Sequence, residues 1–425
     1  MDTQFKFARQ TMMVLLGIVL LTPGCTQAGT AIPEKTGEPE PTPMTELEEP
    51  AQAHLPPTAL LPEPTEAPTP TVETAAGERL WAFKPGSASE PPYWVSPLTS
   101  ATAVNGVVYV GASDLPGGKR GSLHALDAGD GSLLWSYDHN GHTPSTPTVA
   151  DGVVYFGSED HHVYAVDALD GTLLWAYTTG GHVRSQPAVY ETLVFVNSQD
   201  GYLYALDATD GTLQWRFQFD EPVSDMDSSG SLPSSPAVDH GAVFIAGSDH
   251  ILHAINIADG VLRWEYQVDG QVFGSPRASN GIVYVGSLNR RLSALNATDG
   301  SLLWSIRMPG GIVSTPLVDA GTLYATSSVV AALDAYNGLP LWEYDPELRV
   351  PLGSPVIDGQ HLYLASASGR LFVLDKGDGA LLATYDLEKQ PGTKAPGVAN
   401  GVMYVVTKDR FLYAVRLIVS QGENP

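Results

Sequence analysis

Residues Ala165 to Trp175 read AVDALDGTLLW and follow the pattern A-x-[DN]-x-x-[DN]-G-x-x-x-W. The apolar residues before Asp167 favour a strand, and the segment from Asp167 to Gly171 favours a turn. Asp side chains hydrogen-bond to their own backbone in turns and Gly tolerates a positive φ, so the stretch predicts a β-hairpin. Further copies start at Ala125, Ala205, Ala254, Ala294 and Ala332, and a seventh copy from Val373 has Ala383 in place of the tryptophan.

The tryptophan of each copy stands at one fixed place in the repeat. Burying an indole removes about 150–250 Å² from water, which is worth about 4–6 kcal/mol. We therefore expect it to be a wedge between neighbouring units, a packing residue before anything else. The predicted docking residues are Trp81, Trp135, Trp175, Trp215, Trp264, Trp304 and Trp342.

Each repeat contains four apolar runs separated by turn residues, and the period is about 40 residues, which is typical of a propeller or a solenoid. In the second unit the runs are Ser145–Val149, Val153–Gly157, Val163–Asp167 and Thr172–Tyr177. No helical periodicity is present in this region. Seven turns that end in Gly, together with one in which Thr192 replaces the Gly, indicate eight units.

The first and last units are incomplete in a complementary way. The eighth unit has only three runs, the last being Phe411–Arg416, whereas Arg79–Phe83 repeats the fourth-run theme ahead of the first complete unit. A closed ring protects the edges of its first and last sheets through such a seam. The sequence thus predicts an all-β fold, an eight-bladed β-propeller of four-stranded antiparallel blades, closed by the N-terminal strand.

The N-terminus is typical of an export signal. Lys6 and Arg9 precede an apolar run from Met12 to Leu21, which is too short to span a bilayer. Cys25, the single cysteine, follows Gly24 directly and resembles the lipid-attachment site of bacterial lipoproteins. The alternative is ordinary secretion with cleavage nearby.

The segment after Cys25 is rich in Pro, Thr and Glu and cannot bury a core, so we expect an extended tether. The predicted organisation is a lipoprotein signal peptide in residues 1–24, a disordered tether in 25–76, the propeller in 77–417 and a C-terminal tail in 418–425. The chain carries 22 basic against 47 acidic residues, a formal net charge of −25. Such a surface repels phosphate backbones, so a nucleic-acid partner is not expected.

Strand parity puts the connections between runs one and two, and three and four, on one face of the ring. These connections are short. The three longest segments, at Lys84–Thr99, Asp114–Gly121 and Gln218–Pro233, all project from the opposite face. Loops on a rigid scaffold often carry binding groups, although an insertion without a role is the alternative. The candidate binding residues are Tyr93, Trp94, Lys119, Arg120, Arg184, Asp225, Asp227, Arg277, Arg349 and Lys394.

Four of these candidates are cations on or near the first runs, which line the propeller axis: Arg184, Arg277, Arg349 and Lys394. They either bind an anionic ligand or neutralise nearby Asp side chains, and we favour neutralisation. Tyr93 and Trp94 are expected at an interface or over the central funnel.

No metal site is expected. His139, His142, His161 and His162 lack the spacing of a ligand set and are expected on the surface. Asp225 and Asp227 alone do not have the spacing of a calcium loop. No motif of a hydrolase, a zinc protease or a phosphate loop occurs.

The recurring eleven-residue pattern resembles the docking motif of pyrroloquinoline-quinone-type propeller repeats, over Glu78 to about Leu417. Two branches of that family imply different functions. The BamB-like envelope lipoproteins imply a non-catalytic scaffold for protein partners. The quinoprotein dehydrogenases imply a quinone, Ca²⁺, an Asp base and a vicinal disulfide. This chain cannot form the vicinal disulfide, because Cys25 is its single cysteine.

We therefore expect a non-enzymatic, monomeric scaffold without a cofactor. We place it in the cell envelope outside the cytoplasm, attached to the membrane by lipid at Cys25 and bound to a protein partner. If the organism has an outer membrane, that is the expected location. The alternatives are a quinone-dependent dehydrogenase and a glycan-binding propeller, the latter supported only by Tyr93 and Trp94.

Overall fold

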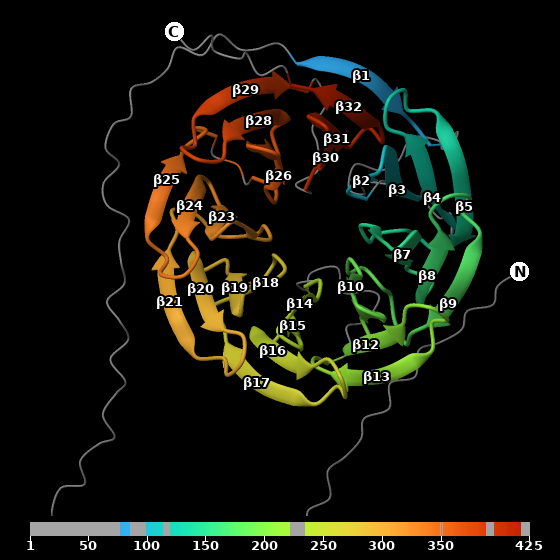
Figure 1. Cartoon of the computed structure of the whole chain (residues 1–425), viewed down its shortest axis with the longest axis horizontal. Coiled ribbons are helices and arrows are strands. Elements are labelled where there is room, and N and C mark those ends of the chain that lie inside the picture. The colour runs from blue at the N-terminus through green and yellow to red at the C-terminus, as the bar shows by residue number, and fades with distance from the viewer. Residues whose placement is uncertain are drawn as a thin grey trace, which may run out of the picture. The chain divides into compact units, whose positions relative to one another are not determined.

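The computed structural model describes residues 77–85, 99–113, 120–221, 234–348, 350, 352–387 and 395–417. Its 32 strands form eight four-stranded antiparallel sheets arranged in a ring (Figure 1). The all-β fold and the eight-bladed β-propeller are thereby confirmed. No helix in the described part of the chain is long and apolar enough to cross a membrane.

The first four blades follow the chain in order, each from its inner to its outer strand. Blade 1 contains β2 (Thr102–Val104), β3 (Val107–Ser113), β4 (Arg120–Asp127) and β5 (Leu133–Asn140). Blade 2 contains β6 (Thr148–Ala150), β7 (Val153–Gly157), β8 (His162–Asp167) and β9 (Leu173–Thr178). Blade 3 contains β10 (Ala188–Tyr190), β11 (Leu193–Asn197), β12 (Tyr202–Asp207) and β13 (Leu213–Gln218). Blade 4 contains β14 (Ala237–Asp239), β15 (Ala242–Ala246), β16 (Ile251–Asn256) and β17 (Leu262–Gln267).

The next three blades repeat this order, and the eighth takes its outer strand from the other end of the chain. Blade 5 contains β18 (Arg277–Ser279), β19 (Ile282–Gly286), β20 (Arg291–Asn296) and β21 (Leu302–Arg307). Blade 6 contains β22 (Leu317–Asp319), β23 (Thr322–Thr326), β24 (Val330–Asp334) and β25 (Pro340–Tyr344). Blade 7 contains β26 (Val356–Asp358), β27 (His361–Ala365), β28 (Arg370–Asp375) and β29 (Leu381–Asp386). Blade 8 contains β30 (Gly397–Ala399), β31 (Val402–Val406), β32 (Leu412–Arg416) and β1 (Glu78–Phe83).

The seam lies where it was predicted. Strand β1 pairs antiparallel with β32, so that Trp81 lies opposite Ala414 and Phe83 opposite Leu412. The same Trp–Ala pairing occurs within blade 2, between Trp175 and Ala165. The N-terminal strand therefore occupies in blade 8 the place that a fourth strand occupies in every other blade.

The start of the innermost strand was predicted too early. The expected run from Ser145 to Val149 forms a strand only at β6, which begins at Thr148. Pro147 has no backbone N–H to give to a ladder, so regular pairing cannot extend through it. Instead the Ser145 hydroxyl bonds to both backbone groups of Gly157, the last residue of β7.

The core consists of eight apolar clusters, one between each pair of neighbouring blades. Alternate residues of a middle strand enter different clusters, because side chains alternate across a strand. In β7, Val154 and Phe156 pack toward blade 1, whereas Tyr155 packs toward blade 3. This two-sided burial explains why the middle strands read as continuous apolar runs.

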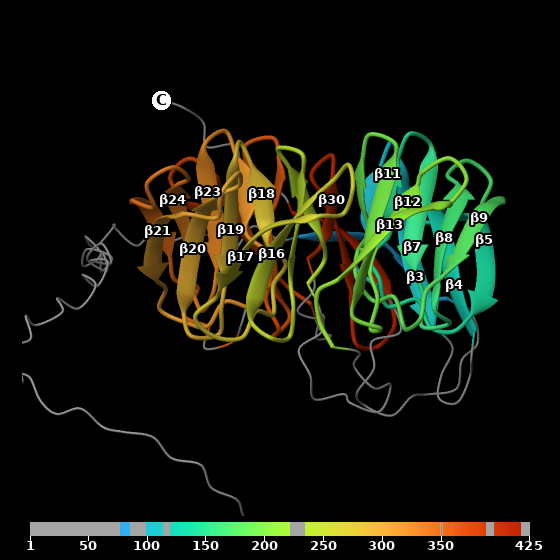
Figure 2. The same cartoon turned by 90° about the horizontal axis from the view of Figure 1, so that it is seen from below.

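The antiparallel pairings put the strand ends on two faces of the ring, which Figure 2 shows from the side. One face carries the connections between strands one and two, and three and four; we call it the turn face. The other carries the two–three and four–one connections; we call it the loop face. Residues 86–98, 114–119 and 222–233, the main part of the three long segments, lie outside the described residues, but the strands that flank them end on the loop face.

Candidate ligand site in the central channel

The seven predicted docking tryptophans share one geometry. Each indole Nε1 donates a hydrogen bond, 2.7 to 3.1 Å long, to a carbonyl in the three–four turn of the next blade. Trp264, for example, bonds to Ala297 O, and its ring packs on Gly300, where a Cβ would lie 2.7 Å from the indole. Because Gly300 has a φ of +74°, it serves both the turn and the contact.

The interface between blades 7 and 8 lacks a tryptophan for a structural reason. Blade 8 receives its fourth strand from the N-terminus, so it has no three–four turn to accept an indole from blade 7. At the equivalent position Ala383 is fully buried, opposite Val373. Met403 and Leu417 belong to the same apolar cluster and help to fill this interface.

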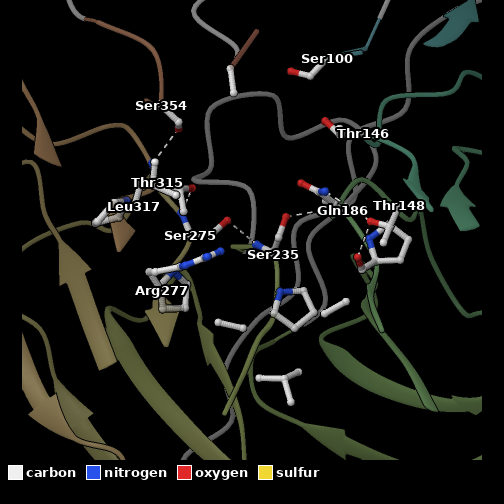
Figure 3. Close-up of a pocket in the computed structure, with 18 of the residues that line it drawn as sticks. Ser100, Thr146, Thr148, Gln186, Ser235, Ser275, Arg277, Thr315, Leu317 and Ser354 are labelled. Atoms are coloured by element: carbon white, nitrogen blue, oxygen red, sulfur yellow. Dashed lines mark hydrogen bonds between the residues drawn. The ribbon is translucent and has the colours of Figure 1, made fainter. Parts of the chain in front are cut away.

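A central channel lies inside the innermost strands, with a cavity volume of about 840 Å³. Such a volume is within the usual range for small-molecule sites. Most of the innermost strands follow a small residue, one further residue and a proline, as in Ser234-Ser235-Pro236. The middle residue of this triplet lines the cavity, and in blades 4 to 7 it carries a hydroxyl group: Ser235, Ser275, Thr315 and Ser354 (Figure 3).

These four hydroxyl groups form an arc linked by the backbone. The amide of Gln186 donates to Ser235 Oγ at 2.9 Å, and the amide of Ser235 donates to Ser275 Oγ at 2.9 Å. The amide of Ser275 then donates to Thr315 Oγ1 at 3.1 Å, and the amide of Thr315 to Ser354 Oγ at 2.9 Å. Each bond joins one blade to the next, so the arc runs from blade 3 to blade 7.

The two predicted axial arginines that the structure describes have different environments. Arg184 is paired with Glu159, with Nη2 and Nε at 2.8 and 2.9 Å from Oε1. Burial opposes ionisation of Glu159, but the hydrogen bond from His142 and the charge of Arg184 outweigh it and hold its pKa at about 2. Arg184 thus neutralises a carboxylate, but that of Glu159 and not of the Asp that the sequence suggested.

Arg277, the first residue of β18, is different. Its side chain is exposed to the channel, and no described residue forms an ion pair or hydrogen bond with it. The surrounding protein desolvates the guanidinium and lowers its pKa. Figure 3 shows Arg277 extending into the cavity beside the hydroxyl arc.

Of the remaining candidates, only Arg120 lies within the described residues. It is the exposed first residue of β4 and lies opposite Asn140 in β5. The others, Cys25, Tyr93, Trp94, Lys119, Asp225, Asp227, Arg349 and Lys394, lie outside the described residues.

The prediction of surface histidines is wrong for His139. This ring is buried, its Nε2 lies 2.7 Å from Thr143 Oγ1, and it packs against Phe156 and Tyr164. His139 lies in the fourth strand of blade 1, at a position whose side chain faces the next blade. The residue type alone does not reveal this burial. Within the described residues, no three His, Cys, Asp or Glu side chains are grouped to hold a metal.

The repeat geometry agrees with a family comparison that covers the propeller. The sequence pattern of the family described as outer membrane protein assembly factor BamB matches residues 71–182, 173–279, 270–393 and 326–418. The chain belongs to this family. Its PQQ-like, BamB-like propeller is therefore confirmed at the level of sequence as well as fold.

Individual relatives add detail. BamB of Alkalilimnicola ehrlichii is 33% identical over 87 residues, which are 20% of this chain and 23% of that protein. The alignment thus spans less than a quarter of the relative. The crystal structure of BamB from Moraxella catarrhalis matches with a TM-score of 0.63 at 17% identity, over 80% of this chain and all of the other.

Two other solved structures also share the propeller fold of this chain. The computationally designed Ika8 protein has a TM-score of 0.63 at 17% identity, over 76% of this chain and 96% of its own. The quinohemoprotein alcohol dehydrogenase of Comamonas testosteroni has a TM-score of 0.60 at 15% identity, over 83% of this chain and 78% of its own. At such identities the likeness concerns the fold alone.

Proposed function

We propose that this protein is a non-catalytic scaffold of the cell envelope, which holds a protein partner on its loop face. The observation that carries the proposal is the family match, which extends over the propeller from residue 71 to residue 418. The family is named for the assembly of outer membrane proteins, and a related role is the function we assign to this chain. A propeller suits such a role because its rigid ring presents many loops at once.

The proposed attachment and location follow from the N-terminus. Cleavage after Gly24 and lipidation of Cys25 anchor the chain, and the Pro-rich segment that follows holds the propeller away from the membrane. Replacing Cys25 with Ser should release the protein from the membrane fraction into the soluble envelope fraction. Retention of the variant in the membrane would contradict the lipid anchor.

The loop face is the proposed docking surface because the three long segments begin and end there. Aromatic residues supply much of the energy of protein contacts, and rim charges mainly steer association. We assign the anchoring role to Tyr93 and Trp94 and the steering role to Lys119, Arg120 and Asp225. These assignments rest on the sequence.

The test begins with crosslinking of the tagged full-length chain in its own cells, followed by identification of the bound proteins. Proteins of outer membrane assembly are the expected partners. Trp94→Ala should then weaken the complex, whereas Asp170→Ala, in a three–four turn on the turn face, should not. Equal loss in both variants, with both folded, would contradict docking on the loop face.

A quinone-dependent dehydrogenase is the second candidate, because the alcohol dehydrogenase of Comamonas testosteroni shares the fold. The residues of the channel do not fit that cofactor set. No described residue that lines the cavity is acidic, so this wall offers neither a carboxylate ligand for Ca²⁺ nor an Asp base. Cys25 alone cannot form a vicinal disulfide.

The dehydrogenase hypothesis is tested by an assay of dye reduction. The full-length chain, incubated with pyrroloquinoline quinone and Ca²⁺, should show no alcohol- or sugar-dependent dye reduction. Turnover above that of the quinone alone would overturn the scaffold proposal.

A further inference from the structure

The charge of the channel wall differs from that of the chain as a whole. The chain carries a formal net charge of −25, with 47 acidic side chains. None of the described residues that line the cavity is acidic, whereas two of them, Arg184 and Arg277, are basic. Acidic groups elsewhere repel anions at long range, so an anion is attracted to this wall only by contacts at short range.

The hydroxyl arc supplies such contacts. Ser235, Ser275, Thr315 and Ser354 each use a lone pair to accept a backbone N–H from the preceding blade. A hydroxyl also has one proton to donate, and no described residue accepts it from these four groups. Each proton therefore remains available to a guest in the channel.

Arg277 adds a fixed charge beside the arc. It follows Ser275 by two residues, and both side chains line the same cavity. A guanidinium keeps its charge in proteins and presents a planar fork of donors that matches carboxylate and phosphate oxygens. Arg184 does not offer the same uncompensated charge, because its Nη2 and Nε already pair with the carboxylate of Glu159 at 2.8 and 2.9 Å.

The rest of the wall includes apolar side chains. Phe273 is 48% exposed and lines the cavity, four residues before Arg277. Leu317 and Val356 line the same cavity from the next two blades. An exposed phenylalanine in a concave site favours a guest with apolar surface, since its burial removes both surfaces from water.

We infer that the central channel binds a small organic anion. Its carboxylate or phosphate group is held by Arg277 and by hydroxyl groups of the arc, and its apolar part rests against Phe273 and Leu317. This site is independent of the proposed scaffold role, because its residues lie on the inner strands or just before them and require no protein partner.

Four probes test the inference on the purified full-length chain at low ionic strength. Phenyl phosphate and benzoate carry both the anionic and the apolar part, inorganic phosphate carries only the first, and phenol only the second. Calorimetry and ligand-observed NMR should show saturable binding of phenyl phosphate or benzoate that is tighter than binding of either single-part probe. Absence of saturable binding by both two-part probes would overturn the inference.

A matched pair of variants locates the site. Arg277→Gln should weaken binding by about tenfold or more, as expected for loss of a charge-assisted contact. Arg307→Gln makes the same charge change in the same blade, at the exposed end of outer strand β21, and should leave binding unchanged.

A third variant separates charge from folding. Arg277→Lys keeps the charge and should retain part of the affinity, and the melting temperatures of all three variants should match that of the parent. Equal affinity in Arg277→Gln and Arg307→Gln would show that anions bind elsewhere. Inorganic phosphate binding as tightly as phenyl phosphate would contradict the role of the apolar wall.

Discussion

Seven of the eight blade interfaces contain a docked tryptophan, and the interface between blades 7 and 8 contains Ala383. The seven indoles bond to the seven three–four turns that the fold possesses. Blade 8 has no such turn, because β1 enters it from the other end of the chain. The exception therefore shows that a docking tryptophan depends on the three–four turn of the next blade and not on the blade that carries it.

The largest effect should come from removing the strand that creates this exception. Deletion of Glu78 to Lys84 leaves β32 with an unpaired edge and removes Trp81 from its bond to Ala128 O. We expect loss of cooperative unfolding of the whole ring, measured by circular dichroism during thermal and urea denaturation. Deletion of residues 40–46, within the Pro-rich segment, is the length-matched control, and equal melting of the two variants would refute the seam.

A smaller effect should follow from removing one indole. Trp304 is 6% exposed and bonds to Ala335 O at 3.1 Å, so Trp304→Ala should cost about 3–5 kcal/mol of unfolding free energy. The neighbouring Leu303 is exposed, and Leu303→Ala serves as the control. Urea denaturation measures both.

The reverse substitution tests the exception directly. Ala383→Trp should not stabilise the ring but cost about 1–3 kcal/mol or more, because the site is fully buried and offers no turn to accept the indole. An increase in stability would show that blade 7 simply lost its tryptophan and that the missing turn is irrelevant.

Two glycine variants separate the packing contact with the tryptophan from the need of the turn for a positive φ. Gly106→Ala and Gly300→Ala both force an L-residue into positive φ, at +79° and +74°, which costs about 1–2 kcal/mol. A Cβ at Gly106 meets nothing within 4 Å, whereas one at Gly300 meets Trp264 at 2.7 Å. We expect Gly300→Ala to be the more destabilising of the two, and equal costs in denaturation would argue against the docking contact.

The smallest effect concerns a polar contact at the interface of blades 2 and 3. Glu159 has a pKa of about 2, below its ordinary value of 4.5, so its ionised form stabilises the fold above about pH 4.5 and this contribution is lost as the pH falls toward 2. Arg184→Gln should cost about 1 kcal/mol at pH 7, and its difference from the parent should shrink over that range. A difference that does not change with pH would exclude Glu159 as the partner.

The repeat could be predicted from the sequence because its causes are local. Gly171 and Asp167 set a hairpin within a few residues, and Trp175 recurs at a constant distance from them. Pro147 is visible in the sequence, and its missing N–H explains why β6 starts only at Thr148. The bond of the Ser145 hydroxyl to Gly157, which takes the place of regular pairing before Pro147, could not be predicted. That preference for a side-chain bond over a ladder is set by the tertiary structure.

The channel could be predicted only in part. Sequence position placed Arg184 and Arg277 near the axis but could not separate them, because the partner of Arg184 comes from a connection 25 residues away. The hydroxyl arc likewise depends on neighbouring blades being in register. Ser235 and Ser275 are 40 residues apart in the chain, and only the packing of blade 4 against blade 5 brings one backbone amide to the other hydroxyl.

Because β1 pairs with β32, the ring can close only after nearly the whole propeller has been synthesised. Glu78 is among the first propeller residues to be made, and its partner Arg416 is among the last. A polypeptide emerges from its N-terminus, so β1 has to wait for nearly the whole propeller before its ladder can form. A product that stopped short of β32 would be left with an unmatched strand at each end, and only a chain translated as far as Arg416 can close.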